Sequence, residues 1–444
     1  MFKRSMLAAA IAAAPFIVVA APPAAAFCGF YVGKADTSLF NEASQVILAR
    51  DGRRTTLSMM NDYKGELTDF ALVVPVPVVL RRDDVKVIEK KTFERLDAYS
   101  APRLAEYFDR DPCAPMPVPR SSGAPLEASG GVRRRGADAL GVKVEDSFSV
   151  GEYDIVILSA KESDGLETWL VQNGYRIPAG AAPALKPYIL QGMKFFVARV
   201  NLKAQARTGS QFLRPLQFSF ESEKFMLPMR LGMINAQGPQ DMIVYVLTRN
   251  GRVESTNYRT VKLPANMDLP TYLRDGKQFT DFYKTMFDQQ ARRESYKAVF
   301  TEYFWDMSWC DPCAADPLSR EELVAAGVAW LGDEPAVAPN SRRPIPPTGA
   351  APVMLTRLHV RYTRESFPED LAFQETKDRQ NFQTRYVLRH PYKINANACD
   401  AAAAYLKALR ERQEREAQQL SNLTGWDIND IRRRQAQAPI PTPR

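Results

Sequence analysis

The sequence predicts an α+β fold, rich in β-strand, made of two internally duplicated antiparallel-sheet-plus-helix units and a C-terminal helix. Asp-Pro-Cys occurs at residues 111–113 and 311–313, and each copy follows a Glu-Tyr-Phe, at 106–108 and 302–304. Similar apolar segments precede Gly52 and Gly251, and the spacings from these glycines to the two Asp-Pro-Cys cysteines nearly agree (113−52=61 and 313−251=62). Self-similarity at a constant offset indicates an internal repeat.

The first 26 residues have the pattern of a cleavable export signal. Lys3 and Arg4 precede an apolar stretch from Met6 to Ala21, and Ala24-Ala25-Ala26 provides a small-residue cleavage site. Cleavage there leaves 444−26=418 residues beginning at Phe27, and a phenylalanine directly before Cys28 argues against a lipoprotein signal. The apolar stretch is shorter than the ~20 residues that span a bilayer, and no later segment is long enough. We expect a periplasmic or secreted protein with no transmembrane segment after cleavage.

The charge balance argues against nucleic-acid binding. The formal net charge is +8 and falls to 8−2=+6 when Lys3 and Arg4 are removed. A nucleic-acid-binding protein needs a basic stripe on a folded module, and export argues further against this class. An anionic ligand or another partner in the cell envelope remains possible.

The first predicted unit covers residues 27–203. Two strands from Val46 to Met59 are joined at Asp51-Gly52, a pair that favours a type I′ hairpin turn. Phe70–Val79 follows as an apolar strand whose two prolines suggest an edge or bulge. Helices are expected at Phe93–Phe108 and Leu166–Asn173, the second ended by Gly174.

The second predicted unit covers residues 211–393 and repeats this order. A hairpin is expected around Asn250-Gly251, then a longer helix over Asp281–Phe304. Two strands, Leu355–Thr363 and Phe382–His390, close the unit.

A C-terminal helical segment is expected over residues 394–434, followed by a disordered tail over 435–444. Asp400–Leu420 is rich in good helix formers. Ala404, Leu406 and Leu409 lie in its first half, and charged residues follow, so the first half is expected to pack and the second to be solvated.

Five cysteines remain after cleavage, and all are candidates for disulfide bonds in an oxidising compartment: Cys28, Cys113, Cys310, Cys313 and Cys399. Two bonds drawn from five cysteines allow 5×3=15 arrangements, so the connectivity stays open. We expect at least one long-range bond among Cys113, Cys310, Cys313 and Cys399, because a bond that closes a long loop constrains the unfolded chain most.

Cys310 and Cys313 also permit a redox hypothesis. The Cys-x-x-Cys spacing, with Trp309 before it and Pro312 inside it, is typical of thiol–disulfide exchange centres. A helix is expected before the motif and Asp316-Pro317 follows, whereas a thioredoxin fold places the motif between a strand and a helix. No second Cys or His pair stands at zinc spacing. No metal and no cofactor are therefore predicted.

The strand Leu355–Thr363 is expected to have one cationic face. Alternation places Leu358, Val360 and Tyr362 on one side and Arg357, His359 and Arg361 on the other. Arg385 and Arg389 alternate similarly in the next strand, and one interpretation is that the five cations form a patch for a carboxylate or phosphate. The alternative is a solvated face whose cations pair with acidic residues, for example Glu365, Asp370 or Glu375.

These patterns lead to two functional hypotheses. The first is a non-catalytic, disulfide-stabilised binding or scaffold protein of the cell envelope, since the chain has no nucleophile elbow, phosphate-binding glycine loop or His-Glu-x-x-His helix. The second is an extracytoplasmic thiol–disulfide oxidoreductase with Cys310 as nucleophile and Cys313 as resolving thiol.

Several motifs together resemble an uncharacterised bacterial family, domain of unknown function 2330. They are Phe27-Cys28-Gly29-Phe30-Tyr31-Val32, Leu72-Val73-Val74-Pro75-Val76-Pro77-Val78, Trp309-Cys310-Asp311-Pro312-Cys313, Leu355-Thr356-Arg357-Leu358-His359-Val360-Arg361-Tyr362 and Arg385-Tyr386-Val387-Leu388-Arg389-His390-Pro391. The resemblance extends over nearly the whole mature chain. It implies export and one family-wide architecture, and it implies no particular chemistry.

Overall fold

The computed structural model describes residues 30–33, 40–64, 70–114, 144–159, 163–175, 180–207, 213–234, 238–274, 276–309, 311, 316–333 and 351–437. These parts form an α+β fold rich in strand, which confirms the predicted class. Residues 1–26, which are expected to form an export signal, and the cysteines 28, 310 and 313 lie outside the described residues.

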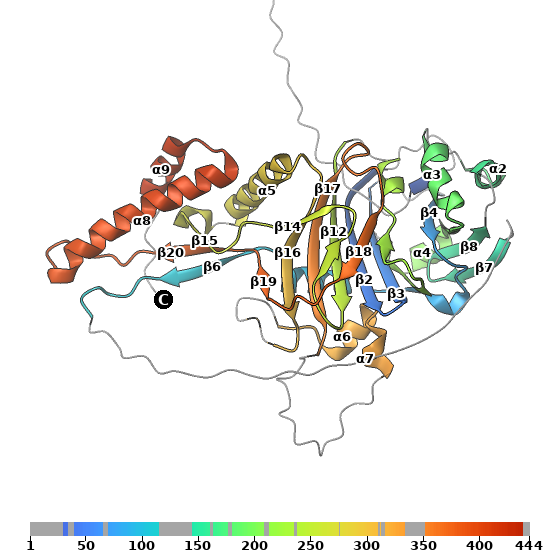
Figure 1. Ribbon diagram of the computed structural model, residues 1–444, viewed down its shortest axis with the longest axis horizontal. Coiled ribbons are helices and arrows are strands. Elements are labelled where there is room, and N and C mark those ends of the chain that lie inside the picture. Colours follow the sequence, from blue (N-terminus) through green and yellow to red (C-terminus); the bar gives the residue numbers. More distant parts are fainter. Residues whose placement is uncertain are drawn as a thin grey trace, which may run out of the picture.

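A large sheet forms the centre of the molecule (Figure 1). Its strands follow the spatial order β14, β16, β17, β12, β2, β3, β10, β5, and β19 pairs with β16. Their bounds in that order are Arg259–Lys262, Ala298–Asp306, Met354–Tyr362, Gln240–Thr248, Phe40–Asp51, Arg54–Lys64, Leu216–Glu221, Val85–Val87 and, for β19, Phe382–Gln383.

Three smaller sheets surround it. The first has the order β1, β4, β9, β8, β7, with bounds Phe30–Gly33, Phe70–Val76, Lys194–Val200, Tyr153–Ser159 and Val144–Val150. The second has the order β11, β18, β13, with bounds Met226–Leu227, Leu371–Glu375 and Val253–Ser255. The third has the order β15, β20, β6, with bounds Met267–Leu269, Arg385–His390 and Arg103–Phe108.

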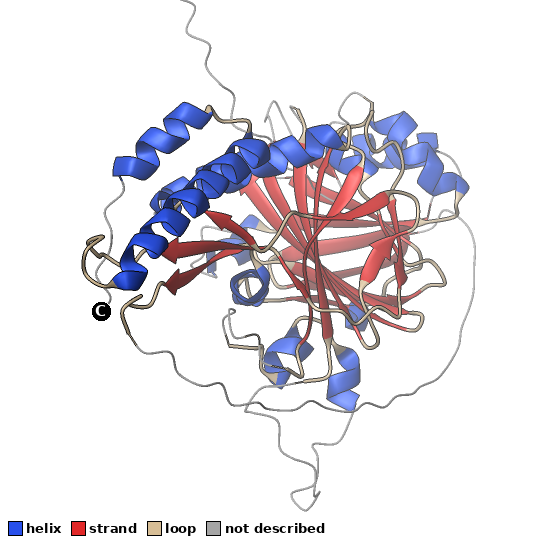
Figure 2. Cartoon of the chain, turned by 60° about the vertical axis from the view of Figure 1, so that its left-hand side comes forward, coloured by secondary structure: helices blue, strands red, loops and turns tan. Residues whose placement is uncertain are grey.

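The helices cover the faces and the margins of these sheets (Figure 2). In chain order, α1 to α9 span Lys91–Ser100, Ser163–Gln172, Ala181–Leu190, Leu202–Arg207, Gly276–Arg293, Arg320–Ala325, Ala329–Asp333, Asp400–Thr424 and Ile428–Gln437. Three short 3-10 helices, η1 to η3, span Arg82–Asp84, Arg230–Met233 and Thr271–Arg274.

The first predicted hairpin is confirmed. β2 and β3 pair antiparallel from Phe40↔Lys64 to Asp51↔Arg54, and Gly52 has a φ of 55° in the turn. Only glycine and a few polar residues adopt this left-handed conformation easily, so the sequence fixes the place of the turn.

The second predicted hairpin is wrong. β12 pairs antiparallel with β17, which is over 100 residues away, while β13, just after Gly251, joins β18 in a different sheet. A Cβ at Gly251 would lie 2.2 Å from the Thr376 carbonyl oxygen, so this glycine permits a close approach of two backbones. The two glycines therefore serve different purposes.

The two similar apolar segments lie side by side. β2 and β12 pair in parallel, with Val46 beside Val244 and Leu48 beside Val246. Because the large sheet takes strands from both sides of residues 203–211, that predicted boundary does not separate two sheets. The superposition of residues 27–203 on 211–393 stays a prediction.

Both copies of Glu-Tyr-Phe lie in strands, and this corrects the helix bounds. The helix expected over Phe93–Phe108 ends at Ser100 and is followed by β6, and the helix expected over Asp281–Phe304 ends at Arg293 and is followed by β16. Both segments contain aromatic residues, and β16 also contains β-branched ones; such residues favour strand once a sheet partner is available. The helix expected over Leu166–Asn173 is confirmed as α2, and Gly174 ends it at φ 82°.

Both faces of the large sheet are covered by other parts of the protein. On one face, Val46, Leu48, Val244 and Leu358 pack against residues of the five-stranded sheet such as Phe196. Two hydrophobic clusters cover the other face: one beneath α1, α6 and α7, and one beneath α5, α8 and α9. The outer face of the five-stranded sheet packs against α2 and α3.

The C-terminal helices and the β15, β20, β6 sheet form an arm on one side of the large sheet (Figures 1 and 2). The predicted division of the long helix is reversed: Ala417, Leu420 and Leu423 in its second half are buried, whereas Leu406 and Leu409 in its first half are only half-buried. The prediction was wrong because α5 covers only the second half. α9 extends to Gln437, into the range expected to be disordered.

Candidate functional site: a buried network of charged residues

A β-bulge in β16 places a carboxylate against the helix-covered face of the large sheet. Thr301 pairs with Leu358 and Tyr303 pairs with Arg357, so Glu302 is the extra residue between them. A bulge redirects side chains, and here Glu302 and Tyr303 both contact groups on the same side of the sheet, Glu302 reaching Arg357 and Tyr303 reaching Tyr99 on α1. Glu302 is only 1% exposed.

Glu302 accepts three hydrogen bonds, two from buried side chains and one from a half-buried tyrosine. The donors are Arg357 Nε at 2.5 Å, His359 Nδ1 at 2.6 Å and the Tyr283 hydroxyl. Burial alone raises the pKa of Glu302, but attraction to Arg357, then to His359, outweighs it and lowers the pKa to about 2. The carboxylate is therefore ionised at neutral pH.

Arg357 links Glu302 to α1. Its Nη1 lies 2.6 Å from Asp97 Oδ1 and 3.3 Å from the Tyr245 hydroxyl, which itself donates to Asp97 at 2.9 Å. Burial lowers the pKa of Arg357, but the neighbouring Tyr245, Glu302 and Asp97 raise it overall, so the guanidinium stays charged.

His359 lies between two carboxylates beneath α5. Its ring stacks on Phe287 at a centroid distance of 3.7 Å, and its Nε2 is 3.5 Å from Asp241 Oδ1. Burial lowers the pKa of His359, but Glu302 and Asp241 together raise it above its usual value. Arg361 donates to Asp241 at 2.7 Å and to Asp288 at 3.1 Å.

The predicted alternation along this strand is confirmed, but its cationic face is neutralised. Arg357, His359 and Arg361 point away from the Leu358, Val360 and Tyr362 core. With His359 protonated, these three cations meet four anions, Asp97, Glu302, Asp241 and Asp288. Arg292 on α5 also pairs with Asp288 at 2.8 Å, so the charges balance at 4−4=0. The acidic partners come from α1, α5, β12 and β16, none of which the sequence pattern had suggested.

Arg385 and Arg389 do not join this cluster. They lie on β20 in the three-stranded sheet, where Arg385 donates to Asn266 at 2.6 Å and Arg389 donates to Asp268 at 2.9 Å. The Arg389 guanidinium also lies over the Tyr107 ring. The expected five-cation patch is therefore not formed, because β17 and β20, which are separated in sequence by β18 and β19, lie in different sheets.

Both histidines of the chain pair with a glutamate of the repeated Glu-Tyr-Phe. Glu302 binds His359 at 2.6 Å, and Glu106 binds His390 at 2.7 Å. Both rings are buried, and each stacks on a phenylalanine, Phe287 or Phe108. A glutamate followed by Tyr-Phe in two separate strands was the sequence signal that could have identified these pairs.

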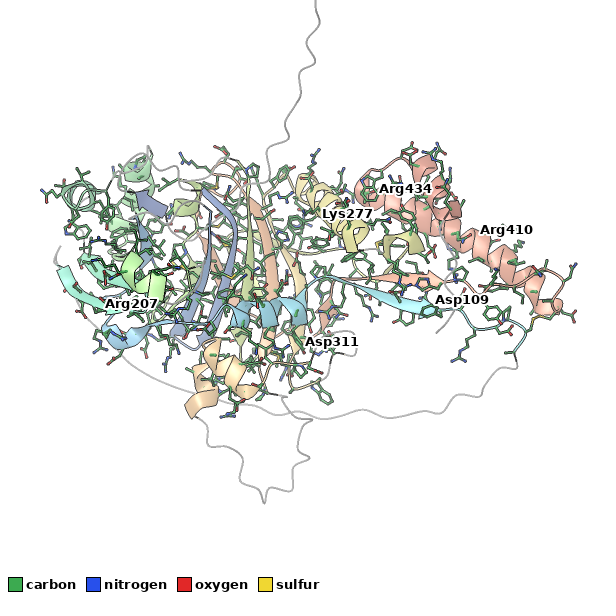
Figure 3. The ribbon with its side chains drawn as sticks, turned by 180° about the vertical axis from the view of Figure 1, so that it is seen from behind. Asp109, Arg207, Lys277, Asp311, Arg410 and Arg434 are labelled. Carbon is green, nitrogen blue, oxygen red and sulfur yellow. A yellow bond between two sulfur atoms is a disulfide. The ribbon has the colours of Figure 1, made fainter. Side chains whose placement is uncertain are left out.

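The disulfide joins Cys113 to Cys399, 286 residues apart, and is the kind of long-range bond predicted. Asp109 supports the same junction: it accepts two hydrogen bonds from Arg412, at 3.0 and 2.7 Å, and one from the Tyr405 hydroxyl at 2.8 Å. Figure 3 shows Asp109 near the end of β6, with Arg410 on the neighbouring helix. Burial raises the pKa of Asp109, but the Arg412 and Tyr405 hydrogen bonds lower it overall.

The predicted redox pair, Cys310 and Cys313, lies outside the part of the chain that the structure describes, as does Cys28. Their neighbours are placed: Trp309 is 55% exposed, and Asp311 is buried and accepts hydrogen bonds from Tyr303 and Gln383.

The buried ion pairs keep charged side chains inside the protein and attach α1 and α5 to the large sheet. Asp241, His359 and Glu302 lie in a row: His359 Nδ1 is hydrogen-bonded to Glu302 at 2.6 Å, whereas His359 Nε2 lies 3.5 Å from Asp241 without a hydrogen bond. Within the described ranges no group of three His, Cys, Asp or Glu side chains is arranged to hold a metal ion. Over the same ranges, no helix has the length and apolar character needed to cross a bilayer.

Comparison with known proteins identifies a family. The model of DUF2330, an uncharacterised protein conserved in bacteria, matches residues 22–374. The chain belongs to this family. The DUF2330 match includes Glu302, Arg357, His359 and Cys113 and ends before β20, so the Arg385–Pro391 segment and Cys399 lie beyond it. No curated protein and no solved structure matches the chain.

Proposed function

We propose that this DUF2330 protein is exported and serves as a disulfide-stabilised binding or scaffold protein of the cell envelope, without catalysis of its own. The observation that carries the proposal is the bond between Cys113 and Cys399. Disulfides persist in extracytoplasmic compartments and are rare in the cytosol, which agrees with the signal-like residues 1–26.

The charged residues support a structural role for the interior. Glu302 is hydrogen-bonded to Arg357 and His359, so the charged groups of these side chains contact one another. In a catalytic site, by contrast, such groups line a pocket that a substrate can enter. The anion-binding part of the hypothesis no longer rests on the five cations, since four of them pair with carboxylates and Arg385 pairs with Asn266. We therefore propose recognition of a partner in the cell envelope.

Export is tested with residues 1–26 fused to a phosphatase that is active only outside the cytoplasm. We expect activity in a bacterial host and a mature full-length protein that begins at Phe27 by N-terminal sequencing. Lys3→Glu/Arg4→Glu should reduce export, and the conservative control Lys3→Arg should not. An inactive fusion together with an unprocessed full-length protein would contradict the proposal.

The alternative is an extracytoplasmic thiol–disulfide oxidoreductase that uses Cys310 and Cys313. The exposure of Trp309 directly before Cys310 is the observation in its favour, since an aromatic side chain beside an exchange-active thiol can contact a partner. An insulin-reduction assay separates the two: turnover lost in Cys310→Ser but kept in Cys28→Ser would establish the enzyme, and no turnover in the wild type would exclude it.

A further inference from the structure

The Cys113–Cys399 bond lies where solvent can reach it. Cys113 follows β6 and is exposed, whereas Cys399 is half-buried at the N-cap of α8. The bond therefore connects the end of a strand to the start of a 25-residue helix. Exposed disulfides are the ones most open to exchange with an external thiol.

The two halves of α8 are held by different forces. Ala417, Leu420 and Leu423 bury the second half in the cluster beneath α5 and α9. In the first half Ala402 is the buried residue. The other attachments that the structure describes there are the disulfide, the hydrogen bonds from Tyr405 and Arg412 to Asp109, and the hydrogen bond from the Tyr392 backbone N–H to the Tyr405 hydroxyl at 2.7 Å. Loss of the disulfide therefore weakens only the first half.

We propose that the Cys113–Cys399 bond is a thiol–disulfide exchange site and that its reduction releases the first half of α8. A thiolate of a dithiol reductant attacks Cys113 Sγ, forms a mixed disulfide and expels Cys399 as a thiolate. The second thiol of the reductant then attacks its own sulfur in that mixed disulfide and releases Cys113. Two electrons and two protons reach the protein, which ends with two thiols, and the reductant ends as a disulfide.

The positions of the two sulfurs determine the direction of attack. Cys113 is the more exposed, and Asp111, whose carboxylate accepts the Cys113 backbone N–H at 2.9 Å, disfavours a thiolate there. Cys399 lies at the N-terminus of α8, where the helix dipole stabilises an anion. Asp400 in the first turn opposes this effect, but it is exposed and screened by water. Cys399 is thus the better leaving group.

The first test locates the mixed disulfide. The purified, oxidised full-length protein is treated briefly with glutathione, quenched with an alkylating reagent and digested for mass spectrometry. We expect glutathione on Cys113 and the alkyl group on Cys399, in at least a tenfold excess over the reverse arrangement. Equal amounts, or glutathione mainly on Cys399, would overturn the assignment of the attacked sulfur.

The second test measures hydrogen exchange with and without reduction by dithiothreitol. Amides of residues 403–411 should exchange at least tenfold faster after reduction, while those of 417–424 and of β2 should not change. Cys113→Ser/Cys399→Ser should reproduce the reduced pattern, and Cys28→Ser should keep the oxidised one. Unchanged exchange in 403–411, or a general rise that reaches β2, would overturn the local release. Both measurements use purified protein, so their outcome is independent of the proposed export and partner.

Discussion

Replacement of Arg357 by methionine tests whether the buried network stabilises the fold. Methionine keeps much of the length and apolar volume of arginine but removes the cation that joins Glu302 to Asp97. Glu302 would remain fully buried, with only His359 and Tyr283 as donors. Removal of one partner from a buried ion pair typically costs about 3–5 kcal/mol, because the other charge stays buried.

The pKa of Glu302 indicates the scale of the interactions that hold its charge. A value held at about 2 rather than 4.5 corresponds to about 3 kcal/mol in favour of the ionised carboxylate. Arg357 is the largest favourable contributor to this shift. Because His359 and Tyr283 remain, we expect Arg357→Met to lower the free energy of unfolding by about 3 kcal/mol, at the low end of that range.

The measurement is urea unfolding at pH 7, followed by tryptophan fluorescence and far-UV circular dichroism. Arg259→Met is the matched control, because Arg259 lies on β14 of the same sheet, is 71% exposed and pairs with Glu294 at 2.7 Å. It should cost less than about 1 kcal/mol. The double variant Glu302→Gln/Arg357→Met should cost at least about 1 kcal/mol less than the sum of the single variants. Equal effects of Arg357→Met and Arg259→Met would refute the reasoning.

The structure supports three more predictions about stability. The pKa of Glu302 is lower in the folded than in the unfolded protein, so ionised Glu302 stabilises the fold fully above about pH 4.5 and less as the pH falls toward about 2. The difference in free energy of unfolding between wild type and Glu302→Gln should therefore be smaller at pH 3 than at pH 6. A constant difference would contradict this reasoning. Gly251→Ala should cost about 3 kcal/mol because its Cβ meets a backbone oxygen, whereas Gly52→Ala, with a positive φ but no atom within 4 Å, should cost about 1 kcal/mol; thermal unfolding that ranks them the other way would contradict the close approach. Leu420→Ala should cost about 2–5 kcal/mol and Leu406→Ala less than about 1 kcal/mol in urea unfolding, and similar values would contradict the assignment of the buried half of α8.

Local signals in the sequence determined local structure. Asp51-Gly52 fixed the β2–β3 turn, because few residues other than glycine adopt the required φ, and Gly174 ended α2 for the same reason. Alternation along Leu355–Thr363 separated the core face from the charged face, since side chains in a strand point to opposite sides in turn.

Only the tertiary structure decided which segments became neighbours. From the sequence, each Glu-Tyr-Phe was predicted to continue a helix, but pairing with neighbouring strands places both copies in β-strands. The bulge at Glu302 then directs its carboxylate toward Arg357 and His359. The sequence left 15 arrangements of two bonds open, and Cys113 pairs with Cys399 because the chain leaving β6 passes the start of α8 in the arm. Spacing along a chain carries little information about contacts between segments hundreds of residues apart, because such contacts depend on the sheet in which each intervening strand pairs.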